Sequence, residues 1–290
     1  MGSPMNIVFA SDEKFSVQLA TTITSILLNA DKNDMFRFYV LDGGLSSQVK
    51  EKINRLKKIK DFEINYVVMN LADFKNCPIC WHFSKATYFR FKIPEIIKEK
   101  KALYMDCDVL VKKSLKSLYS EDLTGFYAAV CDEFAYFDVK KQLKICVERY
   151  FNAGVMLLNI EKMRQDNIQN QAFEFVNKSR DKIVYVDQDV LNVLLEHKLR
   201  FINSIYNFQF NMYLSNVSKL HEQMKNDIVI LHFASDKKPW KFQVPISMTL
   251  CYLYYMVSSG FLGDFCRWYF NDVIVNKLKA LFACVVTCVR

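Results

Sequence analysis

Apolar and polar residues alternate along the first part of the chain in a pattern typical of strands separated by amphipathic helices. A short apolar strand is predicted at residues 6–10, followed by one helical face made of Leu19, Ile23, Ile26, Leu27 and Ala30. A strand at 38–41, a helix capped by Ser46 and an alternating strand at 62–68 come next. This order predicts right-handed crossovers and a mainly parallel sheet of the α/β class.

The same pattern continues to about residue 240. The further predicted elements are a helix at 84–92, a strand at 102–105, a strand at 126–131 before Asp132, a strand at 155–159, a helix at 189–196 and a strand at 227–231 before His232. No repeat, low-complexity tract or linker interrupts the series. We therefore expect a single Rossmann-like domain at 5–240 and a C-terminal helical appendage at 241–290. Residues 1–4 look like a cloning remnant before a native start at Met5.

Two aspartates, Asp106 and Asp108, directly follow the apolar strand at 102–105. Side chains two positions apart on an extended chain point the same way, so both carboxylates are expected at the carboxyl end of this strand. Open α/β sheets bind ligands at that edge, and paired carboxylates suit Mg²⁺ or Mn²⁺. His232 is the candidate third ligand, because a shared sheet would bring the end of its strand to the same edge. A histidine there could also be structural.

Composition narrows the ligand class. The chain has only 7 Gly in 290 residues and contains neither G-x-G-x-x-G nor a P-loop motif, so a glycine cradle for phosphates is disfavoured. The net charge of +8 favours an anionic partner, but no recognition motif accompanies it, and nucleic acid is disfavoured. Nine scattered cysteines favour a reducing cytoplasm. The pair Cys77 and Cys80 has redox or zinc spacing but no second pair, so we expect no such role.

The C-terminal region contains an uncharged stretch, residues 242–263, long enough to cross a bilayer. Its many hydroxyl groups and Pro245 make a helix packed on the domain, or lying in the membrane interface, the better interpretation. From Phe265 onward, aromatic and aliphatic residues mix with lysine and arginine. Such a tail could hold the protein on the inner face of an anionic membrane, or simply cover the core.

Five segments together resemble a known family. Asp106-Cys107-Asp108 is similar to the D-x-D motif of glycosyltransferase family 8, which includes bacterial lipopolysaccharide galactosyl- and glucosyltransferases and glycogenin. Residues 7–12, 151–155, 187–189 and 232–240 resemble the other signatures of this family, in the same order. The resemblance covers about residues 6–240. It implies a GT-A fold, a UDP-sugar donor, Mn²⁺ with Mg²⁺ as an alternative, and retention of anomeric configuration.

Carried over position by position, the resemblance implies roles for individual residues. It implies a metal site of Asp106, Asp108 and His232, and nucleotide contacts from Ala10, Asp12, Lys14, Cys107 and Lys238. It implies donor-sugar contacts from Arg90, Asp132, Asn152, Ala153, Asp187 and Gln188, with His82 near donor or acceptor. Lys14 and Ser235 depart from the residues usual in the family, which bears on the fine nucleotide contacts.

Several of these residues also have simpler interpretations. Asp12 could cap the first helix, and Arg90 could pair with a neighbouring carboxylate. Asn152 could only stabilise the turn before its strand. Asp187 and Gln188 could only begin a helix, where an acidic side chain favours the helix dipole.

The expected activity is transfer of galactose or glucose from a UDP-sugar to a glycan acceptor, such as lipopolysaccharide, capsule or another lipid-linked surface glycan. The clustered catalytic candidates are Asp187 and Gln188, and glutamine is a poor nucleophile. Attack from the leaving-group side, with Gln188 stabilising the oxocarbenium-like centre, is therefore favoured. Two alternatives stay open, an aspartyl-phosphate phosphatase that uses Asp106 and a non-catalytic nucleotide-sugar-binding protein. Residues 133–150 and 205–226 are the expected acceptor loops.

Overall fold

The structure is a computed structural model that describes residues 3–79, 84–134, 144–210 and 227–270. The strands are β1 (Met5–Ser11), β2 (Phe36–Asp42), β3 (Glu63–Val68), β4 (Lys101–Met105), β5 (Val109–Val111), β6 (Ala128–Asp132), β7 (Phe151–Asn159), β8 (Leu199–Phe201), β9 (Phe208–Gln209) and β10 (Ile230–His232). The α-helices are α1 (Ser16–Leu28), α2 (Ser47–Asn54), α3 (Ile93–Ile96), α4 (Lys116–Tyr119), α6 (Ile160–Gln165), α7 (Ile168–Lys178), α8 (Val186–Leu195), α11 (Ile246–Ser258) and α12 (Leu262–Trp268). Short 3₁₀ helices are η1 (Glu13–Phe15), η2 (Arg55–Lys58), η3 (Leu71–Phe74), η4 (Lys85–Lys92), η5 (Arg180–Lys182), η6 (Glu196–Lys198), η7 (Ser204–Asn207) and η8 (Pro239–Lys241).

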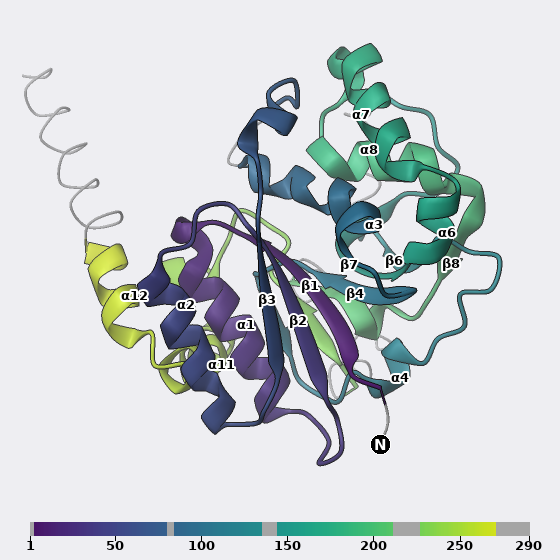
Figure 1. The fold of residues 1–290 in the computed structure, drawn as a ribbon. Coiled ribbons are helices and arrows are strands. Elements are labelled where there is room, and N and C mark those ends of the chain that lie inside the picture. The colour runs from purple at the N-terminus through teal and green to yellow at the C-terminus, as the bar shows by residue number, and fades with distance from the viewer. Residues whose placement is uncertain (1–2, 80–83, 135–143, 211–226, 271–290) are drawn as a thin grey trace, which may run out of the picture.

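The central sheet is mixed and mainly parallel. Among the described residues it has seven strands, in the order β3-β2-β1-β4-β7-β6-β8. The pairs β1–β2, β1–β4, β2–β3 and β6–β8 are parallel, whereas β7 runs antiparallel to both β4 and β6. The predicted α/β class and mainly parallel sheet are confirmed (Figure 1).

A second sheet lies beside the carboxyl end of β4. It joins β5, β10 and β9, with β10 antiparallel to β5 and parallel to β9. His232 is the last residue of β10 and lies opposite Val109. The expectation that His232 shares a sheet with the strand before Asp106 is therefore wrong. The chain turns after β4, and β5 leaves the large sheet to pair with β10 instead.

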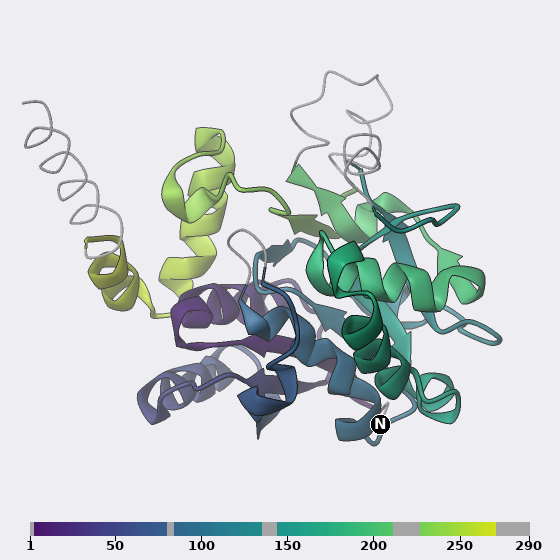
Figure 2. The same cartoon turned by 90° about the horizontal axis from the view of Figure 1, so that it is seen from above.

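Two apolar layers cover the central sheet. Ile7 and Phe9 of β1 face a core with α1, α2 and α11, whereas Val8 faces the opposite core with η4, α3, α6, α7 and α8. The alternation follows from the two-residue period of a strand buried on both faces. Figures 1 and 2 show the two groups of helices on opposite sides of the strands.

Helix α11 of the C-terminal appendage packs on α1. Tyr252, Tyr255 and Met256 of α11 are buried in the same core as α1, and the Asn29 Nδ2 donates to the Tyr255 hydroxyl at 2.9 Å. The same apolar core contains residues from both sides of the predicted domain boundary at residues 240 and 241. The boundary itself stays a prediction. Within the described part of the chain, no helix combines the length and apolar composition needed to span a bilayer. A packed helix is what the structure shows.

Some elements differ from their predictions. The predicted helix at 84–92 is the 3₁₀ helix η4, and the predicted strand at 227–231 shortens to β10. Helices α6 and α7 lie in a stretch for which the apolar pattern makes no prediction. Asn159 begins α6 by accepting a hydrogen bond from the Lys162 amide at 3.1 Å. The Ser46 cap of α2 is confirmed, because its side chain accepts from the Val49 amide.

Candidate active site

The Asp106-Cys107-Asp108 segment joins the two sheets. The Asp106 amide donates to the Gly154 carbonyl at 2.8 Å, which extends the pairing of β4 with β7. The Phe233 amide donates to the Asp108 carbonyl at 3.0 Å, which extends the pairing of β5 with β10. The motif is therefore a turn between β4 and β5, and the extended geometry inferred from a two-residue period is wrong. The carboxylates converge because each is fixed by a different sheet.

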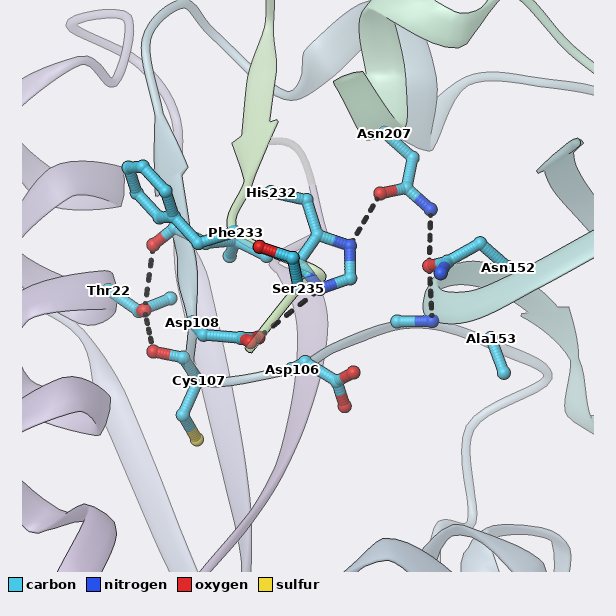
Figure 3. Close-up of polar contacts among 12 residues, drawn as sticks. Thr22, Asp106, Cys107, Asp108, Asn152, Ala153, Asn207, His232, Phe233 and Ser235 are labelled. Carbon is cyan, nitrogen blue, oxygen red and sulfur yellow. Dashed lines mark hydrogen bonds and ion pairs between the residues drawn. The ribbon is translucent and has the colours of Figure 1, made fainter. Parts of the chain in front are cut away.

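Asp106, Asp108 and His232 form a group that could hold a metal ion. One ligand atom from each lies within 4.8 Å of the others, and the His232 Nε2 lies 3.2 Å from the Asp108 Oδ1. The His232 side chain is 2% exposed and the Asp108 side chain 15% exposed. Figure 3 shows Asp106, Asp108 and His232 side by side, with a dashed line that joins His232 to Asp108. Two carboxylates and an imidazole suit Mn²⁺ or Mg²⁺, so this donor set fits the expected ion.

Gly154 makes room for this group. A Cβ atom at this position would lie 2.3 Å from the His232 Cε1 and 2.8 Å from the Asp106 Oδ2. Non-bonded atoms do not approach that closely, so only glycine allows β7 to pass behind both ligands. Glycine is required at this position because the backbone of β7 comes very close to two side chains.

Lys238 lies against the same group. Its ammonium donates to the Asp108 Oδ2 at 2.7 Å and to the Phe233 carbonyl at 2.6 Å. Burial alone would raise the pKa of Asp108, but the Lys238 ammonium is the largest opposing influence, and that pKa is held well below its ordinary value. Asp108 is therefore a carboxylate at neutral pH, as a metal ligand must be.

Arg90 connects Asp106 to Asp187. This buried guanidinium donates to the Asp106 Oδ1 at 2.9 Å and lies 3.0 Å from the Asp187 Oδ2. The Tyr104 hydroxyl also donates to the Asp106 Oδ1, at 2.8 Å, and Thr87 donates to the Asp187 Oδ1. Burial raises the pKa of Asp187 to about 6, although Arg90 opposes the shift. The interpretation of Arg90 as the partner of neighbouring carboxylates is confirmed.

Gln188 and Asn152 lie next to this ion-pair network. The Ala153 amide donates to the Gln188 Oε1 at 2.9 Å, and the Asn152 Nδ2 donates to the Glu133 Oε2 at 2.8 Å. Glu133 also accepts from the Gln188 Nε2, at 3.4 Å. The β6–β7 pairing and the first turn of α8 thus bring Glu133, Asn152 and Gln188 together.

A comparison with protein families identifies the family of the chain. The model of glycosyl transferase family 8 matches residues 6–243. This chain belongs to that family. A protein of Haemophilus influenzae named as a candidate glycosyltransferase is 34% identical over 243 residues, covering 81% of this chain and 73% of that one.

Two further relatives have more specific names. The lipopolysaccharide 1,3-galactosyltransferase of Salmonella typhimurium is 27% identical over 245 residues, covering 81% of this chain and 72% of that one. A crystal structure of galactosyltransferase LgtC with donor and acceptor sugar analogues is 29% identical, covers 88% of this chain and 95% of that one, and superposes with a TM-score of 0.75. The protein is a glycosyltransferase of GT-A fold. The phosphatase alternative has no support from these relatives.

Four of the five residues expected at the nucleotide lie at or just after the ends of β1 and β4, and the fifth, Lys238, follows β10. Ala10 and Cys107 are neighbours, since the Cys107 thiol contacts the Ala10 carbonyl at 3.4 Å. Burial raises the pKa of Cys107 well above its ordinary value, so this residue is an inert thiol. Asp12 caps η1 by accepting from the Phe15 amide at 3.2 Å, and Lys14 is exposed. The capping role proposed for Asp12 is thus present, in a 3₁₀ helix that leads directly into α1.

Asp132, expected at the donor sugar, and Ser235, a departure from the family pattern, both make local contacts. The Asp132 carboxylate is half-exposed and pairs with Arg149 at 2.5 and 2.6 Å. Ser235 is partly buried, and its hydroxyl contacts the Lys237 carbonyl and amide at 3.2 Å. His82 lies outside the described residues, as do Cys80 and much of the two expected acceptor loops.

Sequence reasoning did not single out three residues that contact the candidate site, although two of them, Glu133 and Asn207, lie within the expected acceptor loops. The Asn207 Oδ1 lies 2.8 Å from the His232 Nδ1, and Glu133 accepts from Asn152 and Gln188. Thr22 of α1 lies 2.8 Å from the Cys107 carbonyl and 2.9 Å from that of Val109, so its hydroxyl holds the turn between the two aspartates (Figure 3). Polar residues inside apolar stretches were the only available signal, and such residues are too common to be chosen without the fold.

Proposed function

We propose that this protein is a Mn²⁺-dependent, retaining hexosyltransferase that moves galactose or glucose from a UDP-sugar to a glycan acceptor. The observation that carries the proposal is the convergence of Asp106, Asp108 and His232 in a member of glycosyl transferase family 8. Mg²⁺ is an alternative ion for the same oxygen-rich donor set. When bound, the ion would supply positive charge where the diphosphate leaving group gains negative charge.

The protein's own residues supply the remaining electrostatics. The Lys238 ammonium, already 2.7 Å from the Asp108 Oδ2, is the cation best placed to meet a diphosphate beside that carboxylate. Ala10, Asp12 and Cys107 lie near one another at the strand ends, where a nucleoside would bind in a GT-A fold. Lys14 is exposed nearby in sequence. We propose these residues as the nucleotide site.

The donor sugar would lie between the metal ligands and α8. The residues proposed around it are Arg90, Asn152, Ala153, Asp187 and Gln188. Arg90 donates to the Ala153 carbonyl and to Asp106 and pairs with Asp187, the Ala153 amide donates to Gln188, and Asn152 accepts from the Gly154 amide. Asp132 and His82 are proposed at its rim, although the Asp132 carboxylate pairs with Arg149. The Asp187 Oδ1 accepts from Thr87, and the Oδ2 forms an ion pair with Arg90. This supports Gln188 as the group facing the anomeric centre and attack from the leaving-group side.

Acceptor and location are further parts of the proposal. Relatives include lipopolysaccharide galactosyl- and glucosyltransferases, which supports a lipopolysaccharide, capsular or other lipid-linked surface glycan as acceptor. The described cysteines, six in number, are all free, which supports a reducing cytoplasmic compartment. We place the protein there, on the inner face of the membrane.

The exposed face of α11 supports peripheral membrane association through residues 241–290. Ile246, Leu250, Tyr254 and Val257 follow helical spacing and are 51 to 70% exposed, opposite the face that packs on α1. The chain also carries a net charge of +8, which favours an anionic surface. Sedimentation with vesicles should show binding to phosphatidylglycerol but less to phosphatidylcholine. Replacing Leu250 and Tyr254 with serine should reduce that binding, and equal binding by wild type and variant would reject the membrane role of α11.

The transfer activity is tested by hydrolysis of UDP-galactose and UDP-glucose with and without Mn²⁺. We expect metal-dependent release of UDP, lost in Asp108→Asn and His232→Ala. His197→Ala is the matched control, because the His197 side chain is 82% exposed and far from the strand that carries His232 in sequence. A wild-type protein that binds UDP-sugar but never hydrolyses or transfers it would favour the non-catalytic alternative. Full activity in both site variants would reject the proposed metal group.

A further inference from the structure

The His232 ring has a different partner on each nitrogen. Its Nε2 lies 3.2 Å from the Asp108 Oδ1, on the side of the proposed metal, and its Nδ1 lies 2.8 Å from the Asn207 Oδ1. A neutral imidazole carries one N–H and one lone pair, and only the lone pair can bind a metal. The group that fixes the proton on one nitrogen therefore decides whether the other is available as a ligand.

The orientation of the Asn207 amide follows from its neighbours. The Gly154 backbone N–H donates to the Asn152 Oδ1 at 3.0 Å, and a backbone N–H can only donate. At its other end the Asn152 Nδ2 faces the Glu133 Oε2 at 2.8 Å, and a carboxylate can only accept. Both neighbours thus give Asn152 the same orientation. The group that Asn207 presents to the Asn152 Oδ1, at 2.9 Å, must then be its NH₂.

The other end of the Asn207 side chain is consequently its oxygen, and it faces the His232 Nδ1. That oxygen can only accept, so the Nδ1 must carry the proton. Asn207 and His232 are 0% and 2% exposed, so water does not compete with this contact. Figure 3 shows the chain of contacts from His232 through Asn207 to Asn152. Each hydrogen bond in it points away from the imidazole and toward Glu133.

We propose that Asn207 is a positioning residue that holds His232 in the tautomer with a proton on Nδ1, leaving the Nε2 lone pair for the divalent cation. The inference rests on the proposed metal site and adds the residue that prepares one of its ligands. Because Glu133 also accepts from the Gln188 Nε2 at 3.4 Å, the same chain links the metal ligand to the residue facing the donor sugar. Hydrogen-bonded partners of this kind fix ring orientation and raise ligand affinity in metal sites.

The first test reads the proton directly, in the metal-free full chain labelled with ¹⁵N-histidine. The chain contains only 4 histidines, and loss of one set of signals in His232→Gln assigns those of His232. Long-range ¹H–¹⁵N spectra should show a proton on the Nδ1 of His232 that exchanges slowly. In Asn207→Leu this protected Nδ1 proton should disappear. A wild-type ring with an unprotonated Nδ1 would overturn the inference, whether or not the variant folds.

The second test measures affinity for Mn²⁺ alone, from the electron paramagnetic resonance signal of the free ion. Asn207→Leu should bind Mn²⁺ about 10- to 100-fold more weakly than wild type. Gln209→Leu is the matched control on β9, since the Gln209 side chain is buried and hydrogen-bonds the Phe134 amide and the Asp132 carbonyl, whereas its backbone is the register partner of His232. Its Mn²⁺ affinity should stay near that of wild type.

The two proposals fail differently. If wild type hydrolyses UDP-sugar but Asn207→Leu binds Mn²⁺ as tightly as wild type, the role of Asn207 is wrong and the transferase activity stands. If Asn207→Leu binds Mn²⁺ more weakly than wild type but wild type turns over no sugar donor, the positioning role stands and the proposed activity is wrong. Equal weakening of Mn²⁺ binding in Asn207→Leu and Gln209→Leu would show general loosening of β9 and overturn the inference.

Discussion

At the scale of single residues, the proposed metal ligands can converge only because Gly154 has no side chain. Gly154 allows β7 to pass within contact distance of both His232 and Asp106, and its carbonyl fixes the Asp106 backbone at 2.8 Å. The charged side chains around Gly154 form close ion pairs. Lys238 lies on Asp108, and Arg90 lies between Asp106 and Asp187. Substitutions here should change the site more than the fold.

Gly154→Ala should impair metal binding and turnover. The new Cβ would lie 2.3 Å from the His232 Cε1 and 2.8 Å from the Asp106 Oδ2, so at least one ligand must move. Displacement of about 1 Å in an active site costs roughly 100-fold in rate. The measurement is UDP-sugar hydrolysis together with Mn²⁺ affinity. Gly263→Ala is the control, because a Cβ at that position would have no neighbouring atom within 4 Å, and it should behave as wild type.

Asp187→Asn should remove a pH dependence of stability. The folded-state pKa of Asp187 is raised by burial from 3.8 to about 6, so between these values the folded chain holds a proton that the unfolded chain releases. The stabilisation is therefore present below pH 3.8 and lost as the pH rises through about 6. Relative to Asp187→Asn, wild type should lose up to about 3 kcal/mol of unfolding free energy over this window, at roughly 1.36 kcal/mol per pKa unit. Denaturant unfolding at several pH values measures it, and parallel curves for the two proteins would contradict the shift.

At the scale of elements, helix α1 supports the turn that carries the metal ligands. The Thr22 hydroxyl lies within 2.9 Å of the Cys107 and Val109 carbonyls, the backbone groups on either side of Asp108. Thr24, two residues along the same helix, is also fully buried, but its hydroxyl has no hydrogen-bond partner among the described residues. The two threonines form a natural pair for comparison.

Thr22→Val should cost about 1–3 kcal/mol of unfolding free energy, because it leaves a buried carbonyl without its donor. Thr24→Val should be neutral or slightly stabilising, since it removes an unsatisfied buried hydroxyl. Thermal or denaturant unfolding of both variants measures the difference. Thr22→Val should also weaken Mn²⁺ binding, and equal effects of the two substitutions would show that the hydroxyl of Thr22 does not support the turn.

Helix α11 closes the core on the α1 side with one face only. Met256 is 0% exposed, whereas the adjacent Val257 is 51% exposed. Met256→Ala should therefore destabilise the protein by about 2–5 kcal/mol, the usual cost of such a cavity. Val257→Ala should change stability by roughly 0.5 kcal/mol or less. If Met256→Ala unfolded no more easily than Val257→Ala, α11 would not be part of the cooperative fold.

At the scale of the whole molecule, the site depends on two sheets holding distant segments together. Asp106 and Asp108 are more than a hundred residues from His232 in sequence, and Arg90, Asn152 and Gln188 come from three other elements. None of these contacts exists in the unfolded chain. Ligands that bind across the site must therefore stabilise the folded state as a whole.

UDP with Mn²⁺ should raise the melting temperature of the full chain more than UDP alone. Ligand at about 100 times its dissociation constant contributes roughly 2.7 kcal/mol of stability. Asp108→Asn should abolish the added effect of Mn²⁺, measured from the variant's own ligand-free melting temperature, because the substitution also removes the partner of the Lys238 ammonium. Differential scanning calorimetry measures this, and an undiminished Mn²⁺ effect in Asp108→Asn would place the ion elsewhere.

The sequence alone determined the class of the fold and the position of its main chemical groups. The apolar periods predicted β1, α1, β2 and the mainly parallel sheet, because those patterns are local consequences of 3.6- and 2-residue repeats. The aspartate pair, His232 and the family signatures indicated a sugar-nucleotide transferase. The Ser46 cap also followed from local chemistry, since a helix begins where a side chain can accept its free amides.

Only the tertiary structure decided how these groups meet. The departure of β5 into a second sheet, the close approach of Gly154 and the contacts of Asn207, Glu133 and Thr22 all join segments distant in sequence. Hydrophobic periodicity and secondary-structure propensity are local properties, so they do not indicate which distant residues a side chain contacts. Buried asparagine, threonine and glutamate side chains are therefore recognisable as parts of the site only when the strands around them are in place, because their roles come from the hydrogen bonds that packing forces on them.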